Sequence, residues 1–362
     1  MAIHAYSLKN YHKEWIWKSV IDYLKIDGSY GEGGEQILRT AVTLSAITNT
    51  PIKVENIRKN RRVPGLRPQH LTAIELLGKV CDADVYGLNV GSTSIRFVPN
   101  DFGNFSLKED IGTAGSISLI LQVLIPAVSI SKKSLELVIT GGTDVPWSPT
   151  MNYTKYVLRE VYARMGINFS LDIEKRGYYP KGGGRVKVKV SPIKKLNSIS
   201  LTQRKTKSVN LYCSYSELST ERIQSEVEQA ENILKDADYE VESEITKEDS
   251  LSSGGNMLLF SHDKTSITGL DGLTDTTPNL AQNISTNFLR NYLGVDTHLA
   301  DMIVLPASLV DDTTVYRIKE ITKHLETNLY VTSKITGCKY GVGKLDDGFE
   351  VRIQGNSNSI VQ

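Results

Sequence analysis

Apolar residues recur with helical spacing in several stretches of the chain, and each stretch is followed by a short strand-like run. The pattern predicts two copies of one unit, which consists of a helix, a strand, a second helix and a group of short strands. The predicted ranges are 36–47, 52–57, 68–81 and 94–98 for the first copy, and 116–127, 135–139, 149–165 and 185–190 for the second.

Glycines support this repeat, because Gly31 and Gly34 of the first copy match Gly112 and Gly115 of the second at a constant offset. A third copy is indicated near the C-terminus. There residues 305–307 repeat the apolar-Pro-Ala pattern of 125–127, and residues 324–325 repeat the His-Leu pair of 70–71. Chance similarity of apolar helices is the alternative, but the matching glycines and prolines fall at turns. Three such units predict a pseudo-threefold packing of helices on sheets.

The stretch between the second and third copies is charged and serine-rich. A helix over 217–235, strands over 208–215 and 256–261, and a loop over 250–255 predict a small α/β domain there. The expected fold class is thus α/β of the α+β kind, a large domain of three units with an insert. The predicted divisions are 1–200 for the first two units and an N-terminal extension, 201–293 for the insert, and 294–362 for the third unit. Within the extension, residues 1–24 are expected to form a short helix.

Composition narrows the possible partners and location. The 362 residues are 40% apolar, and 42 Lys and Arg balance 41 Asp and Glu, so a nucleic acid would have to be held by a local basic patch. Three scattered cysteines suit a reducing compartment, and the cytoplasm is the expected location. Since no stretch approaches the roughly 20 apolar residues of a membrane helix, no membrane role is expected.

A glycine-rich turn over residues 27–40 is the first candidate for chemistry. Gly31, Gly33 and Gly34 allow backbone N–H groups to approach a ligand, the helix that follows offers unpaired donors, and Glu32 could hold a cation beside them. The turn therefore suits a phosphate or a metal-bound nucleotide. An ordinary strand-to-helix turn is the alternative, since the spacing matches neither common nucleotide-binding loop.

Basic residues gather between this helix and the next. Arg58, Lys59, Arg61, Arg62 and Arg67 lie within ten positions, and residues 69–70, Gln and His, close the loop at a helix start. Guanidinium groups on a loop that proline restrains suit phosphate oxygens. A solvated basic loop is the alternative.

Two histidines of the third copy are further candidates. If His324 caps the helix predicted over 325–335, the helix dipole would favour a neutral imidazole, which is a nucleophile's environment. A capping or core histidine is the alternative. Asp301, expected at or near the cap of an apolar helix that starts around His298, could bind a ribose hydroxyl or a metal-bound water, and His298 could stack on a base.

Together these motifs resemble one family, the RNA 3′-terminal phosphate cyclases. The matching segments are 27–39, 57–70, 112–122, 141–149, 176–184, 299–301 and 324–328, which run in order through nearly the whole chain. The segment 176–184, Arg-Gly-Tyr-Tyr-Pro-Lys-Gly-Gly-Gly, looks like the hallmark of that family. The resemblance implies three repeats with an insert, and the ATP-dependent conversion of an RNA 3′-phosphate to a 2′,3′-cyclic phosphodiester. It also implies a covalent histidine–AMP intermediate and an adenylylated RNA end.

The resemblance also implies individual roles. His324 matches the adenylylated histidine, and Glu32 would hold a divalent cation, Mg²⁺ or Mn²⁺. The residues expected around ATP are Gln122, Pro149, Thr297, His298, Leu299, Ala300 and Asp301, and those expected on phosphates or RNA are Arg39, Arg58, Arg61, Gln69 and His70. Family members often carry Tyr where this chain has His298, which is a departure from the family's pattern. The partner would be RNA with a 3′-phosphate end, and a homodimer is left open.

Two other classes share this architecture. Cyclase-like factors without catalytic activity act in ribosomal RNA maturation and typically lack the nucleophilic histidine, whose presence here favours the enzyme. Enolpyruvyl transferases use no covalent nucleotide and would not need His324.

Overall fold

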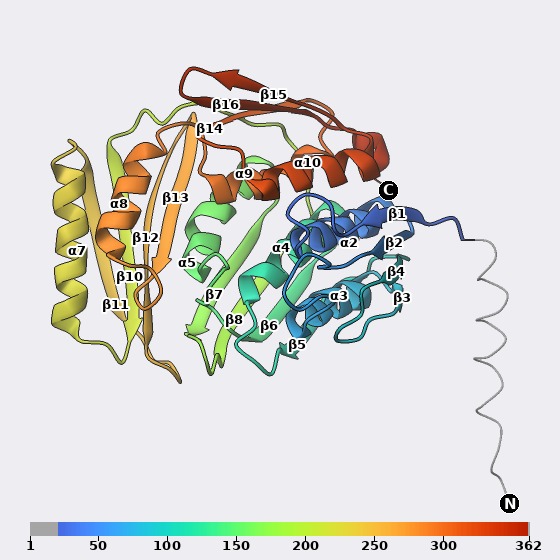
Figure 1. The fold of residues 1–362 in the computed structure, drawn as a ribbon, viewed down its shortest axis with the longest axis horizontal. Helices are drawn as coiled ribbons and strands as arrows, with labels where there is room; N and C mark the ends of the chain where they lie inside the picture. The colour runs from blue at the N-terminus through green and yellow to red at the C-terminus, as the bar shows by residue number, and fades with distance from the viewer. Residues whose placement is uncertain (1–20, 361–362) are drawn as a thin grey trace, which may run out of the picture.

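The structure is a computed structural model that describes residues 21–360. In this range four sheets of four strands form, and helices fill the space between three of them (Figure 1). The helix predicted near the N-terminus falls almost entirely on residues 1–20, which lie outside the described residues. No helix of the described range is long and apolar enough to cross a membrane.

Three of the sheets have the same strand order, and each belongs to one repeat. Every repeat runs strand, helix, strand, helix, strand, strand, with the first two strands parallel and the other neighbours antiparallel. The first repeat comprises β1 (Leu24–Asp27), α2 (Gln36–Thr48), β2 (Ile52–Glu55), α3 (Pro68–Val80), β3 (Asp84–Tyr86) and β4 (Ile95–Val98). The threefold helix-and-sheet repeat predicted from the sequence is confirmed.

The second repeat differs from the first mainly in its second helix, whose middle is a π-helical segment. It comprises β5 (Phe105–Asp110), α4 (Ile117–Ile130), β6 (Leu135–Gly141), α5 (Met151–Tyr153), the π-turn η1 (Thr154–Leu158), α6 (Arg159–Arg164), β7 (Phe169–Lys175) and β8 (Gly184–Val190). The helix predicted over 149–165 is confirmed as a continuous helical run over 151–164. It starts two residues later than predicted, because Thr150 has extended backbone angles and its hydroxyl accepts from the Tyr153 N–H as the cap.

The third repeat is interrupted by the insert. It comprises β9 (Ser200–Leu201), α9 (Thr297–Ala307), β14 (Thr313–Ile318), α10 (Lys323–Thr336), β15 (Lys339–Leu345) and β16 (Gly348–Gln354), followed by the short η2 (Ser357–Ser359). Its first strand, β9, therefore lies before the insert and pairs with β14 more than a hundred residues later. The sequence pattern did not reveal this strand, because two residues give no periodicity.

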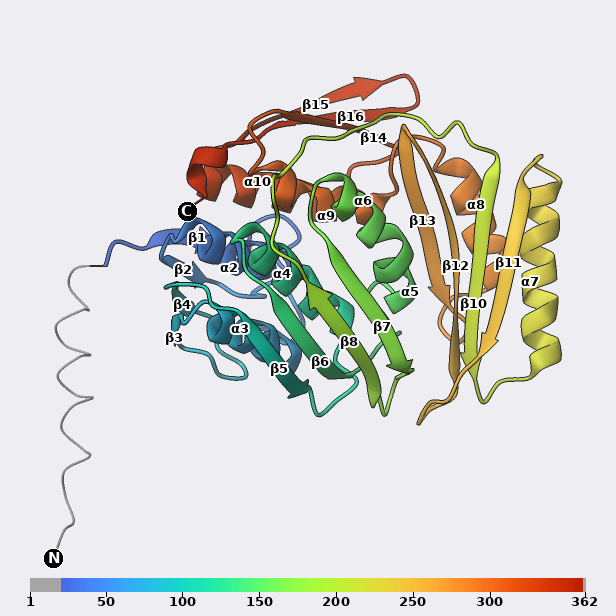
Figure 2. The ribbon, with the colours of Figure 1, turned by 180° about the vertical axis from the view of Figure 1, so that it is seen from behind.

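The insert forms its own sheet and its own buried cluster (Figure 2). It comprises β10 (Ser208–Ser216), α7 (Thr220–Lys235), β11 (Glu240–Lys247), β12 (Gly254–Asp263), β13 (Ser266–Leu273) and α8 (Leu280–Arg290). The sheet order β11-β10-β12-β13 differs from that of the repeats. The exact divisions at residues 200 and 293 remain predictions.

α4 lies among the helices of the repeats and is apolar almost all round. Every one of its residues is buried except Leu119 and Gln122. A helix that is hydrophobic on all faces needs neighbours on all sides, and α4 packs against α2 and α3. Because only Leu119 and Gln122 escape full burial, they mark the side on which α4 meets open space.

Arg176 joins the second repeat to the insert. Its guanidinium is buried, pairs with Asp144 at 3.0 Å and with Glu248 beyond β11, and donates to Asn152 Oδ1 at 2.8 Å. Asn152 in turn donates to Asn256 of β12 at 2.8 Å. Since the hydrogen-bonding groups of this network are paired with one another, the network holds three loops in a fixed arrangement.

We expect Arg176→Met to lower the free energy of unfolding by about 3–5 kcal/mol, because it leaves two carboxylates without their buried partner. Arg185→Met is the matched control, since its pair with Glu174 is exposed and contributes about 1 kcal/mol or less. Urea unfolding of both variants measures the difference. Equal losses would contradict a special role for the buried pair.

Candidate active site

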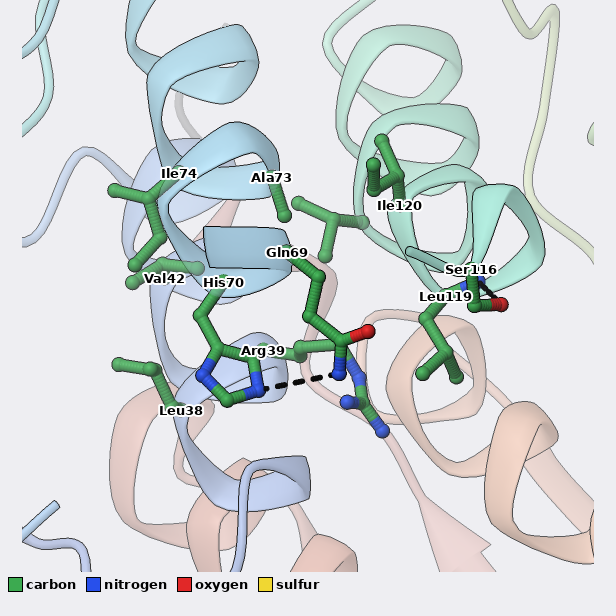
Figure 3. Close-up of a pocket in the computed structure, with 11 residues that line it drawn as sticks. Leu38, Arg39, Val42, Gln69, His70, Ala73, Ile74, Ser116, Leu119 and Ile120 are labelled. Carbon is green, nitrogen blue, oxygen red and sulfur yellow. Dashed lines mark hydrogen bonds between the residues drawn. The ribbon is translucent and has the colours of Figure 1, made fainter. Parts of the chain in front are cut away.

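The N-terminal turns of helices from all three repeats line two adjoining cavities. The first cavity lies between α2, α3 and α4 and is lined mainly by apolar side chains, with Arg39, Gln69 and His70 gathered on one side of it (Figure 3). The second lies between α2, α4, α9 and α10 and is lined by polar residues that include Gln36, Arg39, Gln122, Asp301 and Asn328. Arg39 belongs to both. Helix N-termini carry partial positive charge, so this end of the bundle favours anions.

The glycine-rich turn lies against α10. Gly31 and Gly33 have positive φ angles of 66° and 63°, and a Cβ at Gly31 would collide with the hydroxyl of Thr327. The Glu32 N–H donates to that same hydroxyl at 3.3 Å. A Cβ at Gly34 would collide with the Glu32 carboxylate. The glycines thus permit the close approach that sets Glu32 beside α10.

His324 lies next to Glu32 and is the second residue of α10. The prediction that it caps this helix was wrong, because the cap is Thr322, whose hydroxyl accepts from the Leu325 N–H at 3.0 Å. Glu32 pairs with Arg61, and its second oxygen lies 3.6 Å from His324 Nδ1. That nitrogen is buried and has no hydrogen-bond partner among the described residues.

The surroundings of His324 favour its neutral form. Partial burial lowers the pKa of the imidazole, and the positive charge of Arg39 lowers it further, while Glu35 acts in the opposite direction. The net shift is downward from 6.5, so the ring is uncharged at neutral pH. A neutral imidazole keeps one nitrogen lone pair available for attack.

Arg39 carries buried donors without acceptors. Its Nη2 donates to Gln36 Oε1, but Nε and Nη1 have no partner among residues 21–360. Burial lowers the pKa of this guanidinium, which nevertheless stays charged because arginine does not lose its proton in proteins. A buried, unsatisfied cation is costly, so a group with several acceptor oxygens would stabilise this site.

Behind Arg39 lies a second ionic group at the base of the basic loop. Arg58 Nη1 is 3.7 Å from Glu35, and Arg58 Nε is a further buried donor without a partner in the described range. Burial alone would raise the pKa of Glu35, but the positive charges of Arg39 and Arg58 hold it below its ordinary value. Glu35 therefore remains an anion that offsets part of the positive charge.

His70 is buried and neutral. Burial lowers its pKa to about 4, against the opposing pull of Glu35. Its Nδ1 accepts the backbone N–H of Arg67 at 3.0 Å, and its Nε2 lies 3.5 Å from the Gln69 amide (Figure 3). The ring thus fixes the start of α3, while the Gln69 side chain remains available in the cavity.

The aspartate that caps α9 is not the one predicted. Asp296 is the cap, accepting from the Leu299 N–H at 2.9 Å and from the Tyr153 hydroxyl at 2.8 Å. Asp301 lies inside the helix, so its placement at the cap was wrong. Its buried carboxyl accepts from Thr322 at 3.0 Å, and burial raises its pKa to about 7. A proton on this carboxyl at neutral pH would let it donate as well as accept.

The remaining predicted nucleotide-binding residues lie around the start of α9. His298 is exposed, with its ring centre 6.2 Å from that of Tyr153, and Thr297 is half-buried. Leu299 and Ala300 are in the core, so their side chains are closed to a ligand. Pro149 is buried as well, and its carbonyl accepts from Ser118 of α4 at 2.7 Å. Of this group His298 is the most open.

The structure therefore unites most of the predicted phosphate-binding and catalytic residues, which come from all three repeats. Those around the two cavities are Glu32, Arg39, Arg58, Arg61, Gln69, His70, Gln122, Asp301 and His324. The Pro149 and 297–300 positions flank them at the start of α5 and α9.

The sequence model of the RNA 3′-terminal phosphate cyclase family matches residues 30–342 of this chain. A protein of that name from Methanococcoides burtonii is 37% identical over 335 residues, which is 91% of this chain and all of the relative. The chain belongs to the RNA 3′-terminal phosphate cyclase family.

Relatives of the same name occur in other groups of organisms. The one from Pyrobaculum aerophilum is 34% identical across 92% of this chain and 98% of its own length. The one from Nostoc punctiforme is 32% identical across 89% of this chain and 97% of its own length. The resemblance to the cyclase family that the motifs indicated is confirmed.

Several residues of this cyclase-family site were not predicted. Gln36 and Thr40 of α2 both bond to Asn328 of α10, which also donates to the Asp301 carbonyl at 2.9 Å. Glu35 is the half-buried counter-ion of Arg39 and Arg58. Gln36 and Asn328 lie inside matching segments, but only the packing of α2 on α10 shows what they contact.

His70 gives the cyclase-family chain a specific acid sensitivity. Its folded pKa of about 4 lies below the ordinary 6.5, so the unfolded state binds more protons between these values. Stability is therefore lost as pH falls from 6.5 toward 4, by on the order of 3 kcal/mol. We expect His70→Asn, which keeps an acceptor for the Arg67 N–H, to flatten this part of the curve.

Urea unfolding at several pH values measures this effect. The matched control is His262→Asn at an exposed position on β12, which should leave the curve parallel to that of the unmodified chain. A His70→Asn curve that also runs parallel would contradict the assignment.

Proposed function

We propose that this protein uses ATP to convert an RNA 3′-terminal phosphate into a 2′,3′-cyclic phosphodiester, acting as a ligase through a covalent adenylate on His324. The observation that carries the proposal is the neutral His324 imidazole beside a set of buried, unsatisfied guanidinium donors. The names of the relatives support cyclase activity. RNA with a 3′-phosphate end is the proposed partner.

The residues fit the phosphates of ATP, which is a substrate in this proposal. Arg39 offers Nε and Nη1, and Arg58 offers Nε, as buried N–H donors that lack acceptors among the described residues. Phosphate oxygens accept such paired donors well. Arg61, which is more exposed, is engaged by Glu32 and would be free to turn toward a phosphate if that pair opened.

Glu32 is the carboxylate best placed for a divalent cation. Mg²⁺ in phosphoryl-transfer sites is commonly held by one or two carboxylates together with substrate phosphates. Residues 21–360 contain no group of three or more His, Cys, Asp or Glu side chains that could hold a metal by themselves. We therefore propose that Mg²⁺ or Mn²⁺ arrives with the nucleotide. When bound, the cation would screen phosphate charge during attack.

The proposed chemistry has three displacements at phosphorus. The neutral nitrogen of His324 attacks the α-phosphorus of ATP, a nitrogen–phosphorus bond forms, and pyrophosphate leaves. An oxygen of the RNA 3′-phosphate then attacks the same phosphorus, which frees the histidine and places AMP on the RNA end. Finally the neighbouring 2′-hydroxyl attacks the RNA phosphorus, loses its proton and expels AMP. The last step is intramolecular, so proximity supplies much of its rate.

The nucleoside of ATP is proposed to lie toward the start of α9. The exposed ring of His298 is available for stacking, and Thr297, Asp301 and Gln122 offer polar groups nearby. Leu299, Ala300 and Pro149 would act through their backbone or their shape. The three free, buried cysteines are compatible with our expectation of a cytoplasmic location.

A non-catalytic factor in ribosomal RNA processing is the second candidate. Such a protein would need the phosphate-binding arginines but no nucleophile. His324 lies within reach of the arginines and is held neutral, which favours the enzyme.

Incubation with α-labelled ATP and Mg²⁺ tests the proposal. We expect the protein to become labelled, and His324→Ala to reduce the label by at least about a thousand-fold, because the variant lacks the nitrogen that forms the proposed bond. His262→Ala on β12 is the matched control and should label normally. Full labelling of His324→Ala would show that the nucleophile is another residue.

A further inference from the structure

Two large aromatic side chains, on neighbouring loops of the structure, face solvent. Trp147 is 99% exposed and Tyr179 is 66% exposed, and Leu251, 51% exposed, lies on a third loop. Large apolar groups that gather on a surface commonly mark an interaction site. The three loops join β6 to α5, β7 to β8 and β11 to β12.

These loops form one surface. The Thr143 N–H donates to the Gly177 carbonyl at 2.9 Å, and the Lys181 N–H donates to Ser252 at 3.3 Å. Figure 2 shows the ends of β7 and β11, from which two of the loops depart, at the same edge of the molecule. We call the surface made by Trp147, Tyr179, Lys181 and Leu251 the aromatic ledge.

The base of the ledge is rigid. Asp144, Arg176 and Glu248 come from the same three loops and form the buried ion pairs described above. The rings are therefore presented by a fixed support. Aromatic side chains with two rotatable bonds on such a support lose little entropy when they bind a flat partner.

The ledge is continuous with the candidate active site. A Cβ at Gly182 would lie 2.8 Å from Ala114, and a Cβ at Gly115 would lie 3.4 Å from the Gln69 side chain. The turn before α4 thus bridges the Lys181 loop to the first cavity. On the other side, Trp147 precedes by two residues Pro149, whose carbonyl is bonded to α4.

An exposed lysine follows one of the two aromatic residues of the ledge. Arg176 pairs with both Asp144 and Glu248 and balances one of their two negative charges, and Lys181 is exposed two residues after Tyr179. Asp249, next to Glu248, is exposed and negative, so Lys181 is the cation of the ledge that a phosphate would meet. Aromatic faces interleaved with a cation are the combination that binds single-stranded nucleic acid without regard to sequence.

We propose that the aromatic ledge stacks the nucleotides that precede the 3′ end of the RNA, with Lys181 on their phosphates. The proposal rests on the proposed function, because it places the RNA end in the cavities beside Gln69. Double-stranded ends lack free base faces, so the ledge selects unpaired 3′ ends.

The test compares a 3′-phosphorylated RNA of about twelve nucleotides with a 3′-phosphorylated dinucleotide, which is too short to reach the ledge. For each, kcat/KM for cyclisation is measured in the full chain, in Trp147→Ala and in Tyr179→Ala. We expect the ratio of long to short substrate to fall about ten-fold in each variant. Trp147→Phe should recover most of the ratio. The matched control is Tyr340→Ala, since Tyr340 is 44% exposed on β15 and is not part of the ledge.

An unchanged ratio in Trp147→Ala and Tyr179→Ala, with an active unmodified chain, would overturn the ledge and leave the cyclase function standing. An equal fall in Tyr340→Ala would overturn it as well. If the unmodified chain cyclises neither RNA and takes no label from ATP, the proposed function fails and the ledge with it.

Discussion

The site depends on a buried positive charge that the protein does not fully neutralise. Arg39 lies where the first turns of α2, α3 and α4 meet, and two of its N–H groups have no acceptor among the described residues. Glu35 offsets part of this charge, but the helix N-termini add to it. An anion with several oxygens would remove the imbalance. The same field helps to keep His324 neutral, so one constraint acts on both the proposed phosphate site and the proposed nucleophile.

The threefold architecture makes this concentration of charge possible. Each repeat covers its helices with a sheet on the outside (Figure 1), and residues from the first two turns of α2, α3, α4, α9 and α10 line the two cavities. Contacts such as Glu32 with Thr327 and Thr40 with Asn328 then join parts of the chain nearly three hundred residues apart. The Arg176 network fixes the insert to the second repeat beside this end. The insert thereby contributes a wall of the surface that leads to the cavities.

Local patterns predicted much of the fold and part of the site. Apolar periodicity placed α2, α3 and α4 within a few residues, and positive φ angles at Gly31 and Gly33 explain why glycine marks the turn that carries Glu32. Helix caps were harder to predict, because the backbone angles at Asp296 and Thr322, and not residue type alone, make these two residues the caps. Asp301 and His324 were misplaced for that reason. The long-range pairing of β9 with β14, and the bonds of Asn328, depend on tertiary packing that no local pattern encodes.

An NMR titration of the His324 imidazole, assigned by the loss of its signal in His324→Asn, tests the role of Arg39 most directly. We expect a pKa below 6.5 in the unmodified chain, and an upward shift in Arg39→Met, because a nearby positive charge has been removed. A pKa at or above 6.5 in the unmodified chain, or the same pKa in Arg39→Met, would contradict the view that Arg39 prepares His324 for attack.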